Sequence, residues 1–397
     1  MNRYAEYLKK LREEHTVCVK LEFLNPDGTV LLDVTEDMMQ SGGTLNVTSR
    51  NGCRRTADIT LDNWAGLYDY HVDKLFFGQQ IRLSAGVYLD DGTPFYLPQG
   101  VFYVSNPSEV FEPAGRTTTL SLVDKWAFLD GTLFGKVPGV YILSAGDNLF
   151  QAVRNLLLTD RGNGLPLDGV SPMLSADYTG RTVDIGGVDC PVLQCPYTAR
   201  ISTTYGGVLE EIATMLVAAV GYDARGQLRV ETANRDAVPA AQRQVLWDFT
   251  TREPELLGLN VSPAPVEMYN HVLITGGTLN GRMAFGEATN TDPASPFNVR
   301  RIGKKTFSEA QPKYYADSQC AALAECYLGQ YRAAGNAATI TSVPMFHFQE
   351  NALVTLCREG LDAAPVSYAV TGWTLPIAQT GRMTIQATRL DRAANAG

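Results

Sequence analysis

One stretch of this sequence, residues 98–130, occurs a second time in a fainter form near its end. The early copy consists of Phe102-Tyr103-Val104, a turn at Asn106-Pro107, and Gly115-Arg116 before the run TTTLSL. The late copy consists of Ser367-Tyr368-Ala369-Val370, a turn near Pro376, and Gly381-Arg382 before MTIQA. A matching strand precedes each copy, at Gln80–Leu83 and Ala352–Leu356. Alternating apolar and β-branched residues predict half-buried strands, and a unit used twice predicts two related modules.

The fold class that follows is mainly β with α+β parts, with two related tube-like β-barrel domains and a small α+β middle domain. The expected divisions are an N-terminal helix over residues 1–15, a first barrel over 16–135, a middle domain over 136–255, and a second barrel over 256–397 with an inserted loop and helix. A chain of 397 residues is long enough for two or three domains with cores of their own.

The first 15 residues predict an amphipathic helix, with Tyr4, Tyr7, Leu8 and Leu11 on one face. Two interpretations have equal weight: a cap over the end of a barrel, or a contact with a neighbouring subunit. The barrel strands begin only at residues 16–19, and so short a helix is marginal in isolation. We therefore expect truncation of residues 1–15 to weaken assembly more than folding.

The middle region changes character, because apolar residues recur at helical spacing. One helix is expected after the capping residues Ser144–Asp147, and another from Gly206-Gly207 to Gly221. Between them, about residues 160–205 read as a long loop rich in Gly, Pro and Asp, of a kind that is often functional or contact-making. Further on, residues 277–310 read as an extended, partly mobile insertion, and a helix is expected from Tyr314 to Tyr331.

Composition and charge exclude several classes of protein. The chain is 45% hydrophobic and 19% charged, as in ordinary globular proteins, and no run of about 18 apolar residues predicts a membrane span. Its charged start lacks the apolar segment of a secretory signal, so none is expected. The net charge of −9 argues against wrapping nucleic acid on a basic surface, but it is compatible with DNA that slides past without sticking.

No residues predict a catalytic, cofactor-binding or metal site. The pair Cys190 and Cys195 lacks a second Cys or His pair, so all seven cysteines are expected to be reduced. Asp90 and Asp91 fit a hairpin turn better than a calcium loop. The segment 131–137 is too short between its glycines for a phosphate loop and has Val137 where a hydroxyl is required. The four histidines, at 15, 71, 271 and 347, lack ligand spacing, and His271 reads as a hydrogen-bonded sheet residue. An enzyme is unsupported.

Several runs of residues resemble segments of a known protein family. They are Phe77–Leu83, Pro98–Val104, Asp124–Ala127, Leu129–Gly135 and, in the late copy, Glu350–Val354 with Tyr368 and Met383–Ile385. The likeness is to tail hub proteins (tail-associated proteins of the baseplate or tail tip) of phages and prophages of Gram-positive bacteria. It covers most of the chain, and its motifs are structural.

The resemblance implies a homotrimer in the virion that is made in the cytoplasm of the bacterial host. Its six barrels would match a six-fold tail tube on one side, and its three subunits would match a three-fold tail tip or spike on the other. Implied partners are a distal tail or tail tube protein, a fibre, spike or receptor-binding protein, passing DNA without specific binding, and the tape measure protein. Long C-terminal extensions of some family members are lacking here, so receptor binding and wall digestion are expected of partners. The alternative is a carbohydrate- or receptor-binding β protein, but the four tryptophans are too dispersed in the sequence to indicate the aromatic platform that it needs. The third alternative is an enzyme such as a wall hydrolase.

Two further expectations follow. Residues 16–135 and 256–390 should superpose as barrels of one topology. Because phosphates attract Lys and Arg strongly, the lumen-facing strand residues of the ring should be acidic or neutral on balance.

Overall fold

The structure is a computed structural model of the whole chain. It describes the following residues: 2–49, 51–69, 78–113, 115–176, 182–184, 189–200, 202–232, 245–251, 253–262, 268–293, 295–334, 337–350, 352–359, 362, 364–378 and 380–389.

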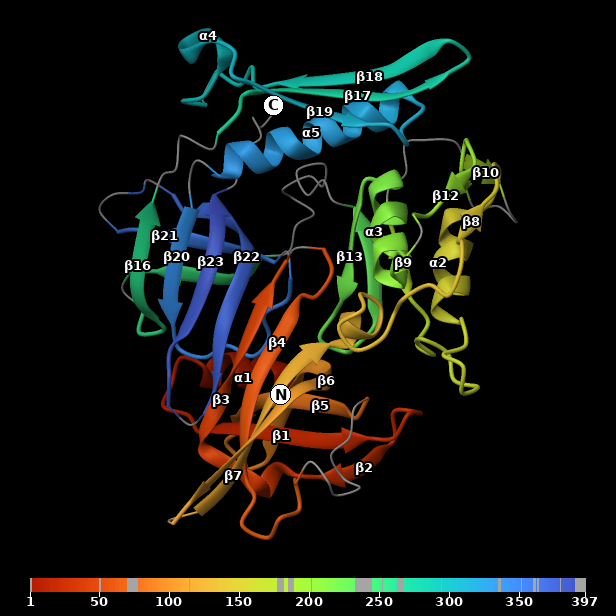
Figure 1. Cartoon of the computed structure of the whole chain (residues 1–397). Coiled ribbons are helices and arrows are strands. Elements are labelled where there is room, and N and C mark those ends of the chain that lie inside the picture. Colours follow the sequence, from red (N-terminus) through yellow and green to blue (C-terminus); the bar gives the residue numbers. More distant parts are fainter. Residues whose placement is uncertain are drawn as a thin grey trace.

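Two strand systems, which we call the first and second barrels, join in one sheet of 13 strands (Figure 1). The first barrel consists of β1 (Val17–Leu24), β3 (Met38–Thr48), β4 (Arg55–Asp62), β5 (Gln80–Tyr88), β6 (Pro94–Glu112) and β7 (Gly115–Asp124), with β2 (Val30–Asp33) at its edge and the short helices η1 (Thr35–Asp37) and η2 (Lys125–Phe128). The second consists of β15 (Val245–Thr250), β16 (Leu256–Ser262), β20 (Ala337–Ser342), β21 (Leu353–Cys357), β22 (Val366–Ile377) and β23 (Met383–Arg389). Together with the middle region described below, this confirms the expected fold class.

The two barrels have the same order of strands. The first runs β3-β4-β7-β6-β5-β1, and the second repeats it as β16-β20-β23-β22-β21-β15, with each strand at the same place along its half of the chain. They differ in the last pair, since β1 is antiparallel to β5 whereas β15 is parallel to β21.

Both barrels also carry a bulge at the same position. The register between β6 and β7 shifts after Val104, and the register between β22 and β23 shifts after Val370. The next side chain makes the same hydrogen bond in each copy: Ser105 Oγ donates to the Ser121 carbonyl (2.9 Å), and Thr371 Oγ1 donates to the Gln386 carbonyl (3.1 Å). A bulge allows one strand to bend without ending. The turn expected at Asn106-Pro107 is therefore wrong, because that segment lies inside β6. The turn expected near Pro376 is not contradicted, because β22 ends at Ile377.

The second barrel begins earlier than residue 256. Strand β15 pairs with β21, and Trp247 and Phe249 on it are buried in the core that the two barrels share. The boundary expected at residue 255 therefore does not coincide with the start of this sheet. A parallel pairing between residues more than 100 positions apart leaves no local signal in the sequence, and the division into domains remains a prediction.

The middle region contains two helices, a small sheet and its own core (Figure 1). Its elements are β8 (Ile142–Leu143), α2 (Leu149–Leu157), β9 (Met173–Ser175), β10 (Thr182–Asp184), β11 (Asp189–Pro191), β12 (Tyr197–Thr198), α3 (Tyr205–Met215), β13 (Ala218–Tyr222) and β14 (Leu228–Thr232). Helix α2 is capped by Asn148, not by Ser144–Asp147. The helix expected to reach Gly221 ends at Met215, because Val217 adopts a positive φ of 51° and the next residues pair with β14 as a strand.

The segment between β16 and β20 forms a compact unit of its own. It consists of β17 (His271–Leu279), β18 (Arg282–Thr289), α4 (Val299–Ile302), β19 (Thr306–Gln311) and α5 (Asp317–Ala334). Strand β17 pairs with β18 on one side and with β19 on the other, and α5 packs against the sheet (Figure 1). The extended, partly mobile insertion expected at 277–310 is thus wrong. Turn-forming Gly, Asn and Pro residues mark its connections and mask the strands between them.

Helix α1 (Arg3–Lys10) packs on its own chain. Tyr7 and Leu11 are buried in the core of the barrels, and Leu8 packs against that core. Salt bridges and hydrogen bonds extend from the helix and the residues just after it to both barrels, including Lys10 Nζ to Asp90 (2.5 Å) and Arg12 Nε to Glu255 (3.3 Å). Of the two interpretations of this helix, the structure therefore supports the cap. The apolar face that the other interpretation assigns to a neighbouring subunit is largely covered by the barrels. The expectation that truncation of residues 1–15 weakens assembly more than folding is therefore replaced by the opposite one.

Candidate functional site: the junction of the two barrels

The barrels are joined edge to edge by β3 and β22. Six residue pairs form this antiparallel ladder, from Gly372 opposite Thr48 to Ile377 opposite Gly43. The backbones approach so closely that a Cβ on Gly42 would lie 1.8 Å from the Ile377 carbonyl oxygen, and Gly42 also has a φ of 68°. Only glycine combines that conformation with that contact. The junction is therefore part of a continuous sheet and holds the two barrels in a fixed relation.

A buried ion pair crosses the same junction. Arg55 of β4 is 1% exposed, and one of its terminal nitrogens lies 2.6 Å from the Glu350 carboxylate, which precedes β21. The other donates to the Gln99 carbonyl of β6 at 2.6 Å, and Gln99 donates in turn to the Phe346 carbonyl at 2.8 Å. Buried charges are tolerated when they are paired and hydrogen-bonded. This network therefore connects the first barrel to the second through the interior.

Sequence reasoning missed Arg55, although a signal was present. Along β4, Arg55 occupies the same face as Ala57, Ile59 and Leu61, all of which are buried. A charged residue on the apolar face of an alternating strand predicts a buried partner. The identity of that partner, 295 positions later, is not encoded locally.

Tyr7 forms a third link across the junction. Its hydroxyl accepts a hydrogen bond from the Phe346 N–H (3.0 Å) and lies 3.0 Å from Nδ1 of His347. Burial lowers the pKa of His347 to about 4, so the imidazole is neutral near pH 7 and Nδ1 can accept the hydroxyl proton. The ring of Tyr7 also packs against Phe95 of the first barrel, with centroids 5.4 Å apart. One residue of α1 therefore contacts both barrels.

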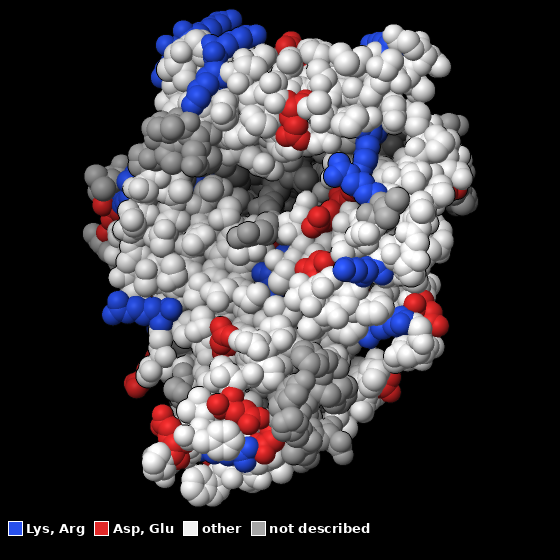
Figure 2. Space-filling view, in the orientation of Figure 1, with Lys and Arg blue, Asp and Glu red and all other residues white. Residues whose placement is uncertain are grey.

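Charged side chains of both signs are scattered over the face seen in Figure 2, with two local clusters. Lys and Arg form a cluster at the corner where Figure 1 places α4, and Asp and Glu gather toward the opposite end, near the β6–β7 hairpin. Phe111, at the tip of that hairpin, is 66% exposed and is stacked by Arg116 at 4.3 Å.

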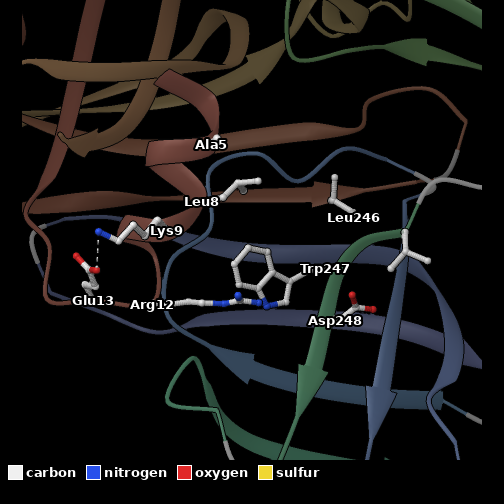
Figure 3. Close-up of a pocket in the computed structure, with 9 residues that line it drawn as sticks. Ala5, Leu8, Lys9, Arg12, Glu13, Leu246, Trp247 and Asp248 are labelled. Carbon is white, nitrogen blue, oxygen red and sulfur yellow. Dashed lines mark ion pairs between the residues drawn. The ribbon is translucent and has the colours of Figure 1, made fainter. Parts of the chain in front are cut away.

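An open groove of about 430 Å³ lies between α1 and β15 (Figure 3). Its lining combines Leu8 and Trp247 with charged groups, and Figure 3 shows Arg12 lying against the indole, 5.0 Å from its centroid. Lys9 and Glu13 at its rim form a salt bridge of 3.4 Å. These charges neutralise one another, and the lining contains neither Cys, Ser nor His.

In the described part of the chain, the histidines and cysteines considered from the sequence are not grouped at one site. His271 is hydrogen-bonded within its sheet, with Nδ1 2.9 Å from Thr306 Oγ1, whereas His71 lies outside the described residues. Burial raises the pKa of the Cys18 thiol to about 11 and of the Cys53 thiol to about 12. Cys195 has a free thiol, and the side chain of Cys190 is outside the described part. In the parts of the chain that the structure describes, no three His, Cys, Asp or Glu side chains are grouped as metal ligands.

The titration of His347 gives a prediction about pH. Because its pKa is lowered from 6.5 to about 4 in the folded state, the unfolded state takes up a proton first as pH falls. His347 should therefore reduce the free energy of unfolding by about 2 kcal/mol between pH 7 and pH 5. We expect the advantage of the native chain over His347→Gln, which keeps an acceptor for Tyr7, to shrink by that amount in urea unfolding.

Comparison with the variant is necessary because Asp124 changes the free energy of unfolding with pH in the opposite direction. Burial raises its carboxyl pKa from 3.8 to about 6, against three backbone N–H donors, so this group favours folding more strongly as pH falls from 6 to 4. The pH dependence of the native chain alone combines both effects. An identical pH profile for the native chain and His347→Gln would contradict the prediction.

The junction and the repeated strand order can be compared with known proteins. No protein-family model matches this chain, and no curated protein matches its sequence. Solved structures do match: a tail protein from Neisseria meningitidis has a TM-score of 0.62 and 11% sequence identity over 94% of this chain and 96% of the other. This chain has the fold of phage tail proteins.

Two prophage proteins support the same statement. The 43 kDa tail protein of prophage MuSo2 from Shewanella oneidensis has a TM-score of 0.58 and 11% identity, over 94% of this chain and 98% of its own. The prophage tail protein gp18 from Listeria monocytogenes has a TM-score of 0.56 and 9% identity, over 94% and 95%. Because the sequence identities are so low, the similarity to these tail proteins is one of backbone fold. In the described residues, no helix has the length and apolar character needed to cross a membrane.

Proposed function

We propose that this chain is a structural hub of a phage or phage-like tail, located at the baseplate or tail tip of the virion and without enzymatic activity. Three copies form a ring in which two barrels from each subunit give six nearly equivalent positions. Such a ring matches a six-fold tail tube on one side and a three-fold tip or spike on the other. The barrels line the channel through which DNA passes, and lumen-facing side chains are acidic or neutral on balance.

The observation that carries this proposal is the repetition within the chain. The two barrels share their strand order, the bulge after Val104 and Val370, and the hydrogen bond that follows it. A ring protein that presents two similar edges must also hold them rigidly, and the β3–β22 ladder and the Arg55–Glu350 pair supply that rigidity. The fold likeness to tail proteins supports the same conclusion.

The partners that fit this role are a distal tail or tail tube protein above the ring, and a fibre, spike or receptor-binding protein below it. The tape measure protein is a further partner of the channel. The alternative of a carbohydrate-binding protein needs an aromatic platform. Three of the four tryptophans are buried, and only Trp64 is exposed, at 72%. A single exposed tryptophan does not provide such a platform, so the tryptophans do not favour a carbohydrate-binding protein.

The oligomeric state of the full chain tests the proposal. With a chain mass of 43.3 kDa, sedimentation should give a trimer of three times that value, about 130 kDa. Electron microscopy of the trimer should show six barrel-sized densities at even spacing around a channel. A chain that remains monomeric at all concentrations and binds a cell-wall glycan would instead favour the receptor-binding alternative.

A further inference from the structure

The connection from β18 to β19 crosses one end of the small sheet. Thr289, at the end of β18, and Thr306, at the start of β19, both lie opposite His271, the first residue of β17. The chain between them must therefore pass around the end of β17. Figure 1 places its short helix α4 at an outer corner of the molecule.

Buried amide side chains hold this connection in one conformation. Asn270 and Asn290 are fully buried, and Asn298 is 3% exposed. Asn270 Nδ2 donates to the Gly303 carbonyl (2.8 Å), and its Oδ1 accepts from the Lys305 N–H (2.7 Å). Asn298 Nδ2 donates to the Asp292 carbonyl (2.7 Å). Such a satisfied buried network rigidifies the backbone it binds, so the connection is a built feature of the sheet end.

The tip held in this way is basic and has an aliphatic centre. We call residues 299–305 the basic tip. Arg300, Arg301, Lys304 and Lys305 are all exposed, and Ile302 between them is 54% exposed. Within the described chain, Arg300, Arg301 and Lys304 form no salt bridge, and no Asp or Glu occurs in the segment. Four positive charges in seven residues contrast with the net charge of −9 of the whole chain. Figure 2 shows the corresponding cluster at the corner of α4.

We infer that the basic tip binds an anionic phospholipid surface. Lys and Arg side chains are attracted to anionic headgroups, and an aliphatic side chain among them can enter the boundary with the acyl chains. Nucleic acid phosphates would use the four cations but not Ile302. A stable protein interface requires about 800 Å² and 20–30 residues on each side, more than a tip of seven residues offers. The exposed isoleucine and the small size thus favour the lipid surface.

This inference goes beyond the proposed hub function and does not depend on it. A tail component that approaches a bacterial envelope meets an anionic bilayer, but the recognition chemistry lies entirely in one corner of one subunit. The trimer can therefore be tested by sedimentation without lipid, and failure of one proposal leaves the other standing.

The test is co-sedimentation of the full chain with vesicles. We expect binding to phosphatidylcholine vesicles that contain about 30% phosphatidylglycerol, no binding to pure phosphatidylcholine, and release at about 1 M salt, where the Debye length is roughly 3 Å. The double variant Arg300→Glu/Lys304→Glu should bind at least about 25-fold more weakly, since each cation contributes roughly fivefold. Ile302→Glu should also weaken binding. These side chains are exposed, so circular dichroism should show unchanged folding.

Matched controls exist elsewhere on the surface. Arg154 and Lys136 are exposed cations, and Leu158 is a 62% exposed aliphatic residue, all outside the basic tip. Arg154→Glu/Lys136→Glu and Leu158→Glu should bind vesicles as the native chain does. Equal losses in these controls, or no binding at about 1 mM anionic lipid, would overturn the inference. So would competition by inorganic phosphate, or tight binding of duplex DNA that is indifferent to Ile302→Glu.

Discussion

Removal of α1 should destabilise the barrels themselves. Tyr7 is fully buried, and its hydroxyl satisfies the Phe346 N–H and faces His347. We expect Tyr7→Ala to reduce the free energy of unfolding by about 3–5 kcal/mol, as for other buried aromatic residues, and deletion of residues 1–15 to cost more. The measurement is urea unfolding followed by the fluorescence of tryptophans, two of which, Trp247 and Trp373, lie in the same core.

Two further substitutions sharpen this test. Tyr7→Phe keeps the ring but leaves the buried Phe346 N–H without its acceptor, so it should cost about 1–3 kcal/mol. Tyr4→Ala is the matched control on the same helix, because Tyr4 is 38% exposed, and it should have a small effect. If deletion of α1 left the unfolding midpoint unchanged but abolished the trimer, the helix would belong to an interface between subunits after all.

The second large effect is expected at the Arg55–Glu350 pair. Arg55→Met removes the cation and leaves the Glu350 carboxylate buried without its partner, which should reduce the free energy of unfolding by about 3–5 kcal/mol. The double variant Arg55→Met/Glu350→Met removes both charges and should recover much of that loss. A double-mutant cycle in urea unfolding measures the coupling between the two residues.

A surface pair provides the control for this cycle. Arg282 and Asp317 form an ion pair with side chains that are 79% and 47% exposed, so Arg282→Met should cost less than about 1 kcal/mol. If Arg55→Met were equally mild, the pair would not lock the barrels together. In that case the rigid relation between the barrels would rest on the β3–β22 ladder and on the contacts of Tyr7.

The contacts of Tyr7 and of Arg55, on which these two predictions depend, cannot be identified from the sequence. The sequence shows Tyr7 as part of an amphipathic face, but its partner His347 is 340 positions away in the chain. The same is true of Arg55, whose place on the apolar face of β4 indicated burial but not Glu350. Amphipathic periodicity shows that a face will be covered, not what will cover it.

The sequence by itself determined the repetition. Period-2 alternation and the paired Gly-Arg segments are local, so they indicated strands in both halves and a mainly β fold. The buried amide network of the small sheet and its basic tip leave no clear signal in the sequence, because Gly, Asn and Pro residues predict a loop there. Their partners, such as Asn270 and Gly303, become visible only in the folded chain.

Only the tertiary structure decided how the two halves are combined. The ladder between β3 and β22, the inclusion of β15 in the second barrel and the bulges within β6 and β22 all depend on which backbones approach one another. Backbone hydrogen bonds between distant strands are almost independent of side-chain identity, whereas local alternation depends on side chains alone. For that reason, the pattern of the sequence predicts that strands form, and the packing of the whole chain selects the pairs.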